Sequence, residues 1–130
     1  LQLCKSGDHI ISSRTVYGGT YAFLKNFTPQ LGIETDFVDI TSLDDIKKLI
    51  KPTTKIIYCE VSSNPLLEIA DIESISEIAK KNNLKLIVDN TFTPLSVSPL
   101  KNGADIVIHS LTKFINGTSD TIAGVVCSNK

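Results

Sequence analysis

The sequence contains no methionine and no tryptophan, and its 130 residues include only three cysteines. Cys4, Cys59 and Cys127 are odd in number and widely spaced, which argues against a disulfide framework or a zinc cluster. Cys59 and Cys127 both lie in apolar runs, so we expect these two thiols to be buried.

Long apolar segments and dense charge are also missing. No apolar run approaches the ~20 residues that a membrane-spanning helix needs, and no signal-peptide pattern begins the chain. Thirteen basic residues balance fourteen acidic ones, for a formal net charge of −1, and neither sign forms a dense run. The basic footprint of a nucleic-acid binder is therefore lacking. These absences predict a soluble, cytoplasmic protein that binds neither membrane nor nucleic acid.

The length and composition suit one globular core. Hydrophobic residues make up 42% and charged residues 21% of the chain, which is an ordinary balance for a folded domain. Residues 1–7 are interpreted as the end of a helix that Gly7 stops. Because the chain begins so abruptly and has no initiator methionine, we expect it to be a fragment of a longer protein.

Short apolar runs alternate with helical patterns along the chain. Apolar side chains at helical spacing predict a helix over residues 20–31, after a break at Gly18-Gly19. Ser42 and Asp71 are the predicted N-caps of two further helices. The predicted strands lie at residues 8–13, 34–40, 55–60, 84–89, 104–109 and 121–127. This alternation predicts an α/β fold, with a mainly parallel sheet and flanking helices joined by right-handed crossovers.

Ligands of open parallel sheets bind beyond the carboxyl ends of the strands. The predicted strand ends bring Glu60, Asp89 and His109-Ser110 to that edge, and the loops that follow carry Asn64, Thr91 and Thr112-Lys113. Loops held by a rigid sheet are where binding and catalytic groups concentrate. This edge is therefore the predicted site.

Lys113 lies just past a predicted buried strand, close behind Ser110 and Thr112. A solvated loop lysine is the simpler interpretation of such a residue. The functional alternative is an amine that forms a Schiff base with an aldehyde, which requires a partly desolvated lysine. The two neighbouring hydroxyls could then bind a phosphate.

Asp89 closes the apolar run of the fourth strand, and Tyr17 directly precedes Gly18-Gly19. A carboxylate at a strand end could hold a pyridine nitrogen protonated, or it could simply form a cap or an Asx turn, and its position leaves both open. The Tyr17 phenol could stack on a planar ring, although a turn with a packed tyrosine is the simpler interpretation.

Other polar residues carry less information. Asn64-Pro65 could be only a turn. His9 and His109 are interpreted as structural, because neither has a serine, aspartate or metal-spaced partner in the sequence. The sequence has no Walker-type loop and no dinucleotide fingerprint.

Several segments in order along the whole chain resemble one known family, the pyridoxal-phosphate (PLP) enzymes of Cys/Met metabolism, which act in trans-sulfuration. The matching segments are Val16–Thr20, Glu60–Pro65, Val88–Pro94, Gly103–Val107, His109–Gly117 and Thr121–Val125. One departure is Thr118, because the family usually has histidine or glutamine directly after the glycine that Gly117 matches. It leaves the assignment of the lysine standing.

The resemblance implies a role for each candidate residue. Lys113 would form the Schiff base with pyridoxal 5'-phosphate and shuttle protons, Asp89 would pair with the pyridinium nitrogen, and Tyr17 would stack on the ring and act as an acid–base group. The implied cofactor-binding residues beyond these three are Ser110 and Thr112 at the phosphate, Asn64 near the phenolic oxygen and Thr91 against the ring.

The resemblance also implies a fold and an assembly. Residues 1–130 would be part of the large PLP-binding domain of the aspartate-aminotransferase-like (type I) fold, without the N-terminal arm and the C-terminal small domain. The phosphate-binding glycine-rich loop would precede Leu1, and the arginine that grips the substrate carboxylate would follow Lys130. At full length the protein is expected to form a homotetramer, as a dimer of dimers.

The activity that the resemblance implies is elimination or replacement at the γ or β carbon of a sulfur amino acid or an O-acylhomoserine. A methionine γ-lyase-like C–S lyase or an O-acylhomoserine sulfhydrylase is favoured, since residues 120–124 are similar to those branches, although Gly19 stands where methionine γ-lyases often have cysteine. The alternatives are a cystathionine γ-synthase or lyase, a type I PLP aminotransferase, and an inactive truncated module.

Overall fold

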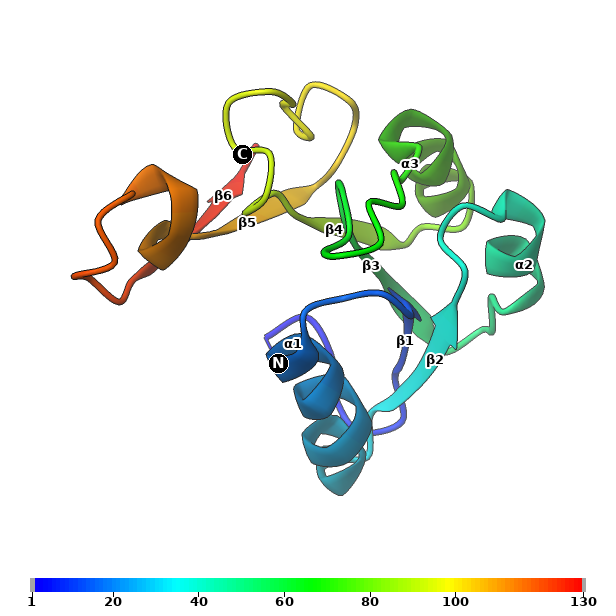
Figure 1. Ribbon diagram of the computed structural model, residues 1–130. Coiled ribbons are helices and arrows are strands. Elements are labelled where there is room, and N and C mark those ends of the chain that lie inside the picture. The colour runs from blue at the N-terminus through cyan, green and yellow to red at the C-terminus, as the bar shows by residue number, and fades with distance from the viewer. Residues whose placement is uncertain (1, 130) are drawn as a thin grey trace.

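The computed structural model describes residues 2–129 and contains a six-stranded sheet with the order β2-β1-β3-β4-β5-β6 (Figure 1). The strands are β1 (His9–Ser13), β2 (Glu34–Val38), β3 (Thr54–Glu60), β4 (Lys85–Asp89), β5 (Ile106–Ser110) and β6 (Gly124–Ser128). The first five are parallel, and only β6 pairs antiparallel, with β5. The prediction of a mainly parallel sheet is therefore confirmed.

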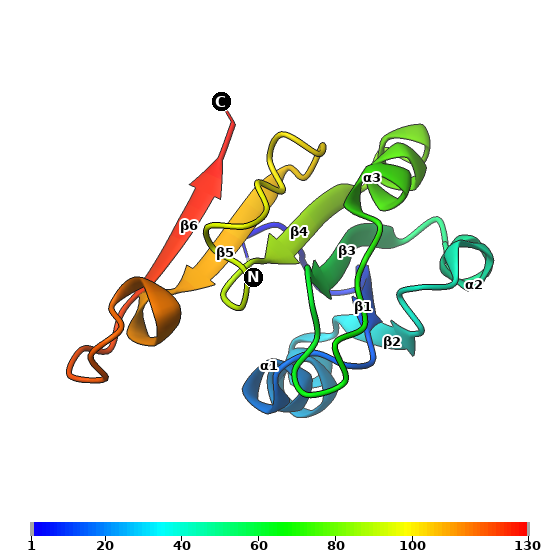
Figure 2. The same cartoon turned by 45° about the horizontal axis from the view of Figure 1, so that its top comes forward.

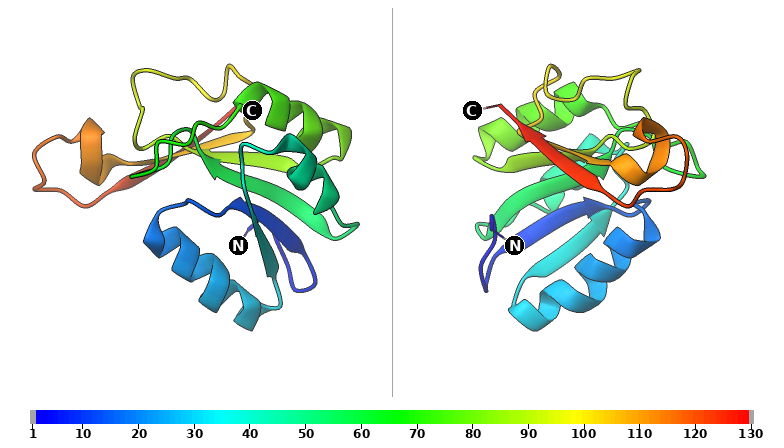
Figure 3. Two further views of the ribbon diagram at one scale, coloured as in Figure 1. Left: turned by 45° about the vertical axis from the view of Figure 1, so that its right-hand side comes forward. Right: turned by 90° about the vertical axis from the view of Figure 1, so that its left-hand side faces the viewer.

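Helices cover both faces of this sheet (Figure 3). One face carries α1 (Gly18–Ala22), which continues into the helical turns η1 (Phe23–Phe27) and η2 (Thr28–Leu31). The other face carries α2 (Leu43–Lys48) and α3 (Ile72–Lys81). Since successive side chains of a strand point to opposite faces, strands β1 to β4 contribute to two cores.

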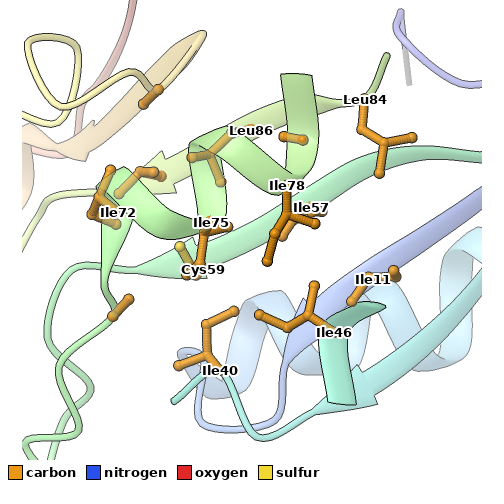
Figure 4. Packing of buried hydrophobic residues seen from close by; sticks show 14 of the residues in the cluster. Ile11, Ile40, Ile46, Ile57, Cys59, Ile72, Ile75, Ile78, Leu84 and Leu86 are labelled. Atoms are coloured by element: carbon orange, nitrogen blue, oxygen red, sulfur yellow. The ribbon is translucent and has the colours of Figure 1, made fainter. Parts of the chain in front are cut away.

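The larger core lies between the sheet and α2 and α3. Ile11, Ile57 and Leu86 project from three neighbouring strands and are fully buried with Ile46 of α2 and Ile75 of α3 (Figure 4). This core fixes the strands relative to one another and so fixes the edge where they end.

The smaller core lies on the face covered by α1, η1 and η2. Ile10 and Ile56 of the sheet pack there with Leu24 and Ile33. Along each strand, residues two positions apart point to the same face, so Tyr58 packs against this core together with Ile56.

The predicted helix caps are confirmed. Asp71 precedes α3, and its carboxylate accepts a hydrogen bond from the amide of Ser74 (3.1 Å). Ser42 precedes α2, where its hydroxyl donates to the Asp45 carboxylate (2.8 Å). Asp71 thus satisfies a free amide of its helix, whereas Ser42 occupies the N-cap position of α2 without a side-chain bond to an amide.

Two local predictions are wrong. Gly18-Gly19 does not break the chain but forms the first turn of α1, where the amides need no intrahelical partner. Residues 2–7 are not the end of a helix. They form turns in which the amide of Lys5 donates to Asp8 Oδ2 (2.9 Å) and the amide of Gly7 donates to the carbonyl of Gly32 (2.7 Å). Leu1 lies outside the described residues.

The thiols are less uniform than expected. Cys59, in the centre of the sheet, is buried, and burial raises its pKa to about 12. Cys127 is only half-buried, because β6 is the last strand of the sheet.

Over residues 2–129 the helices are all too short or too polar to cross a bilayer.

Candidate active site

A cavity of about 850 Å³ lies at the carboxyl ends of the parallel strands, which is a size typical of small-molecule sites. Its lining comprises Tyr17, Glu60, Ser62, Asn64, Asp89, Thr91, Phe92, Ser110, Thr112, Lys113, Phe114, Gly117, Ser119 and Ile122. All seven residues predicted from the sequence for the cofactor are in this set. The structure therefore brings them together at one place, while their roles stay predictions.

The strand register explains why three of these side chains share one face. Glu60 and Asp89 are direct register partners at the ends of β3 and β4. Ser110 ends β5, and alternation from the buried Val107, which points to the opposite face, directs Ser110 to the same side. The face concerned is the one that α1 covers, so Tyr17 at the start of α1 reaches the same cavity.

Asp89 is held by a chain of hydrogen bonds across two strand ends. The amide of Thr91 donates to Asp89 Oδ1 (2.9 Å), and the amide of Ser110 donates to Thr91 Oγ1 (2.8 Å). The hydroxyl of Tyr58 lies 3.4 Å from Asp89 Oδ2. The Asx turn anticipated from the sequence is thus present, and it uses one carboxylate oxygen only.

Lys113 lies in the turn η3 (Leu111–Ile115), where its own dihedral angles (φ −94°, ψ −120°) interrupt the helical conformation. This segment stands away from the sheet beside the start of β6 (Figure 2). Across residues 2–129 no ion pair involves Lys113. Lys113 is exposed, which differs from the partly desolvated lysine that we expected, because η3 projects from the end of the sheet (Figure 2).

The start of this segment is hydrogen-bonded to Ala123, the residue just before β6. The amides of Leu111 and Thr112 both donate to the Ala123 carbonyl (2.9 and 3.3 Å). The Thr112 hydroxyl accepts from the Ala123 amide (3.0 Å) and donates to the Ala123 carbonyl (3.2 Å). Thr112 would therefore have to release this carbonyl before its hydroxyl could donate to a phosphate.

Tyr17 is fixed through its backbone rather than its ring. Its amide donates to Glu60 Oε1 (2.7 Å), although the two residues are 43 apart in sequence. The side chain is 68% exposed. Burial raises the pKa of the Glu60 carboxyl, the Tyr17 hydrogen bond opposes this shift, and the neighbouring Asp89 adds to it.

Sequence reasoning named Glu60 as a strand-end residue but gave it no role. The sequence did contain a signal for a functional role of Glu60, because this residue ends an apolar strand in the same way as Asp89 does. Phe92 and Phe114 were also missed; their rings meet edge to face at 5.6 Å, between the loop after β4 and η3. No sequence spacing predicts such a contact.

The two histidines lie outside this cavity. Buried His9 begins β1, at the opposite end of the sheet, with Nδ1 2.8 Å from the Thr54 hydroxyl and Nε2 3.1 Å from Asp36 Oδ2. His9 therefore has spatial partners that the sequence did not reveal. His109 borders a second, smaller cavity on the other face. In the part of the chain that the structure describes, no cluster of His, Cys, Asp and Glu has the makings of a metal site.

The fold and the cavity define an α/β protein with a small-molecule site at the carboxyl edge of its sheet. Comparison with known proteins narrows this class. The model of the family described as "Cys/Met metabolism PLP-dependent enzyme" matches residues 1–130. The chain belongs to this family, which confirms the predicted family and its cofactor, pyridoxal 5'-phosphate.

Individual relatives agree with this assignment. The chain is 48% identical over 128 residues to an L-methionine gamma-lyase of Fusobacterium nucleatum subsp. polymorphum, covering 97% of this chain and 32% of that protein. It is 49% identical over 127 residues to a cystathionine gamma-lyase of Bacillus subtilis (strain 168), covering 97% and 34%. The chain thus spans about a third of the length of these relatives.

Solved structures confirm the type I fold. The cystathionine gamma-lyase from Lactobacillus plantarum, complexed with L-serine, superposes with a TM-score of 0.96 at 41% sequence identity, over 99% of this chain and 34% of that one. At this level of identity and structural agreement, the two chains share the same fold over the matched residues.

The donor set of the cavity fits the family cofactor. A phosphorylated pyridine aldehyde requires an amine, a carboxylate for the ring nitrogen, a flat surface for the ring, and hydrogen-bond donors for the phosphate. Lys113, Asp89, Tyr17 and Ser110 supply these groups around one cavity, and Asp89 keeps one oxygen outside its Asx turn.

Proposed function

We propose that this chain forms the cofactor-holding part of a PLP-dependent lyase that cleaves a C–S bond of a sulfur amino acid. The observation that supports it most strongly is the convergence of Lys113, Asp89 and Tyr17 on one cavity at the strand ends, in a chain of this family. The two relatives described above are both lyases and match almost equally well, so the proposal rests on the chemistry that they share.

Each residue would have a defined task. Lys113 Nζ would hold the cofactor aldehyde and, once displaced by the substrate amine, take the proton from the substrate α-carbon. Asp89 would keep a proton on the pyridine nitrogen, and Tyr17 would cover one face of the ring. The remaining cavity residues proposed as ligands are Ser110 and Thr112 for the phosphate, Asn64 near the phenolic oxygen and Thr91 beside the ring.

When bound, the cofactor withdraws electrons from the substrate α-carbon and so makes its proton removable. The contribution of the chain is to position groups and to control protons. Asp89 suits its task because two strand ends hold it in place through Thr91 and Ser110, so that little reorganisation is needed when charge develops.

Replacement at the γ or β carbon, with an O-acylhomoserine as substrate, is the second candidate activity, since both reactions begin with removal of the same proton. Product analysis separates the possibilities. A lyase releases a 2-oxoacid, ammonia and a thiol from one sulfur amino acid, a sulfhydrylase consumes a thiol, and an aminotransferase requires a keto acid acceptor. The homotetramer and the cytoplasmic location are part of the proposal and are testable by light scattering and cell fractionation.

The decisive experiment uses the protein at its full natural length. Adding PLP should produce a visible absorbance band, and borohydride reduction should leave a cofactor mass on the peptide that contains Lys113. Lys113→Ala should abolish both signals, whereas Lys101→Ala, in an exposed loop, should retain them. A band that persists in Lys113→Ala, or a cofactor mass on another peptide, would contradict the proposal.

A further inference from the structure

We propose that Glu60 is the positioning residue of Tyr17: its carboxylate holds the backbone of Tyr17 so that the phenol ring is presented to the cavity. This inference rests on the proposed function for its catalytic consequence, but its structural part is independent of any cofactor.

The single contact between these residues joins two separate parts of the fold. Glu60 ends β3 in the middle of the sheet, while Tyr17 begins α1, four residues after the end of β1. The Tyr17 amide donates to Glu60 Oε1 at 2.7 Å, a short bond with the strength expected of a charged acceptor. It ties the start of α1 to the strand end that also carries the cavity.

The helix itself gives Tyr17 little support. Tyr17 is the N-cap residue of α1, and its own side chain makes no capping hydrogen bond to this helix. The Tyr17 carbonyl accepts from the amide of Tyr21 (2.9 Å) within the first turn. That bond fixes Tyr17 relative to α1 but not relative to the strand ends, so the tie to Glu60 sets its place in the cavity.

The position of the Tyr17 ring depends on the position of the Tyr17 backbone, because few side chains pack against the ring. It is 68% exposed, and its close neighbour is the backbone of Gly19, where an added Cβ would lie 2.8 Å from Tyr17 Cε1. An exposed ring leaves its position when its backbone moves, since no surrounding side chains oppose the displacement. The Glu60 contact therefore controls the position of the phenol.

Glu60 can perform this task in either charge state. Burial raises the pKa of its carboxyl, and a protonated carboxyl still has a carbonyl oxygen that accepts a hydrogen bond. Glutamine at this position keeps that acceptor and removes the charge, whereas alanine removes both. The pair of variants separates positioning from a purely electrostatic influence of Glu60 on neighbouring Asp89.

The first test is hydrogen exchange of the Tyr17 amide, measured by mass spectrometry with residue-level fragmentation in the cofactor-free protein at full length. Glu60→Ala should speed exchange of this amide by roughly 10- to 100-fold, the factor that corresponds to losing one hydrogen bond to a charged group. Glu60→Gln keeps a neutral acceptor and should speed exchange clearly less than Glu60→Ala does, and Glu77→Gln, on the exposed side of α3, should change nothing. Unchanged exchange at Tyr17 in Glu60→Ala, with a folded protein by circular dichroism, would overturn the proposal.

The second test is a double-mutant cycle on turnover of a sulfur amino acid. Glu60→Ala should lower kcat roughly 10- to 100-fold while Glu60→Gln restores most of it, and Glu60→Ala should have little further effect in a Tyr17→Ala background, which has no ring to position. Additive losses would mean that Glu60 acts separately from Tyr17 and would overturn the inference. If the protein binds no cofactor at all, the proposed function fails, but the exchange experiment still decides the role of Glu60.

Discussion

The ring of Tyr17 occupies the space beside the α-carbon of Gly19, so closely that a Cβ at residue 19 would lie 2.8 Å from Cε1. Real Cβ atoms do not approach other atoms so closely, so one of the two groups must move. Gly18, the adjacent residue, has open space around the equivalent position. One glycine of the pair thus controls a proposed catalytic side chain, and the other does not.

Gly19→Ala should displace the phenol with little loss of stability, because the obstructing atom belongs to a mobile, exposed side chain. Turnover should fall about tenfold, since displacing a group that covers the ring weakens its alignment. Gly18→Ala is the matched control and should retain activity. The comparison requires kcat and thermal unfolding of both variants; equal activity in Gly19→Ala and Gly18→Ala would show that the ring position is unimportant.

Asp89→Asn should bind PLP but turn over substrate roughly 10²–10⁴-fold more slowly, because a neutral amide does not keep a proton on the pyridine nitrogen. Asparagine can still accept the Thr91 amide through its side-chain oxygen, so the turn after β4 should survive. Absorbance titration with PLP and steady-state rates separate the two effects. Asp44→Asn, on the exposed side of α2, serves as the control, and full activity in Asp89→Asn would remove its electronic role.

The buried His9 should make folding stability fall as the pH drops below about 6.5, the ordinary pKa of histidine. Burial lowers its pKa, Lys51 adds to this effect, and Asp36 opposes it. A histidine whose pKa in the folded state lies below its unfolded value of about 6.5 binds protons preferentially when unfolded. Its contribution to stability is therefore complete above that unfolded value and is lost as the pH falls through the lower pKa of the folded state. The free energy of unfolding, measured with urea at several pH values, should change less with pH in His9→Gln than in the wild type. An identical pH dependence in the two proteins would contradict this assignment.

Ile75→Ala should reduce the free energy of unfolding by about 2–5 kcal/mol, since this side chain is 0% exposed in the larger core and its removal leaves a cavity. Glu77→Ala on the same helix should change stability by about 0.5 kcal/mol or less. Chemical denaturation of both variants tests the difference. Similar midpoints would mean that α3 contributes little to holding the sheet.

The strands and the site edge could be predicted because their physical causes are local. Continuous apolar runs such as residues 55–60 identify buried parallel strands, and the convergence of strand ends then groups Asp89 with Lys113. The direction of β6 was not predicted, since an apolar run has the same pattern in either direction.

Contacts between distant parts of the chain could not be predicted in the same way. The Tyr17–Glu60 bond and the His9–Asp36 pair depend on which helix lies over which strand and on the register between strands. The exposure of Lys113 depends on how a short segment leaves the sheet after β5, and residue spacing does not encode that path. The N-cap positions of Ser42 and Asp71 could be predicted, because the pattern that marks a helix start extends over only about three residues.

Within residues 2–129, the outer edge of β6 has no strand paired to it, and this bears on laboratory handling of residues 1–130. Val126 on this strand is 68% exposed and Ile122 just before it is 96% exposed, and an open strand edge offers backbone groups to any other strand. Purified by itself, a protein of residues 1–130 should be prone to edge-to-edge aggregation at high concentration. A lysine at position 126 would be the first change to make for crystallisation or spectroscopy, because a charge on an edge strand discourages such pairing.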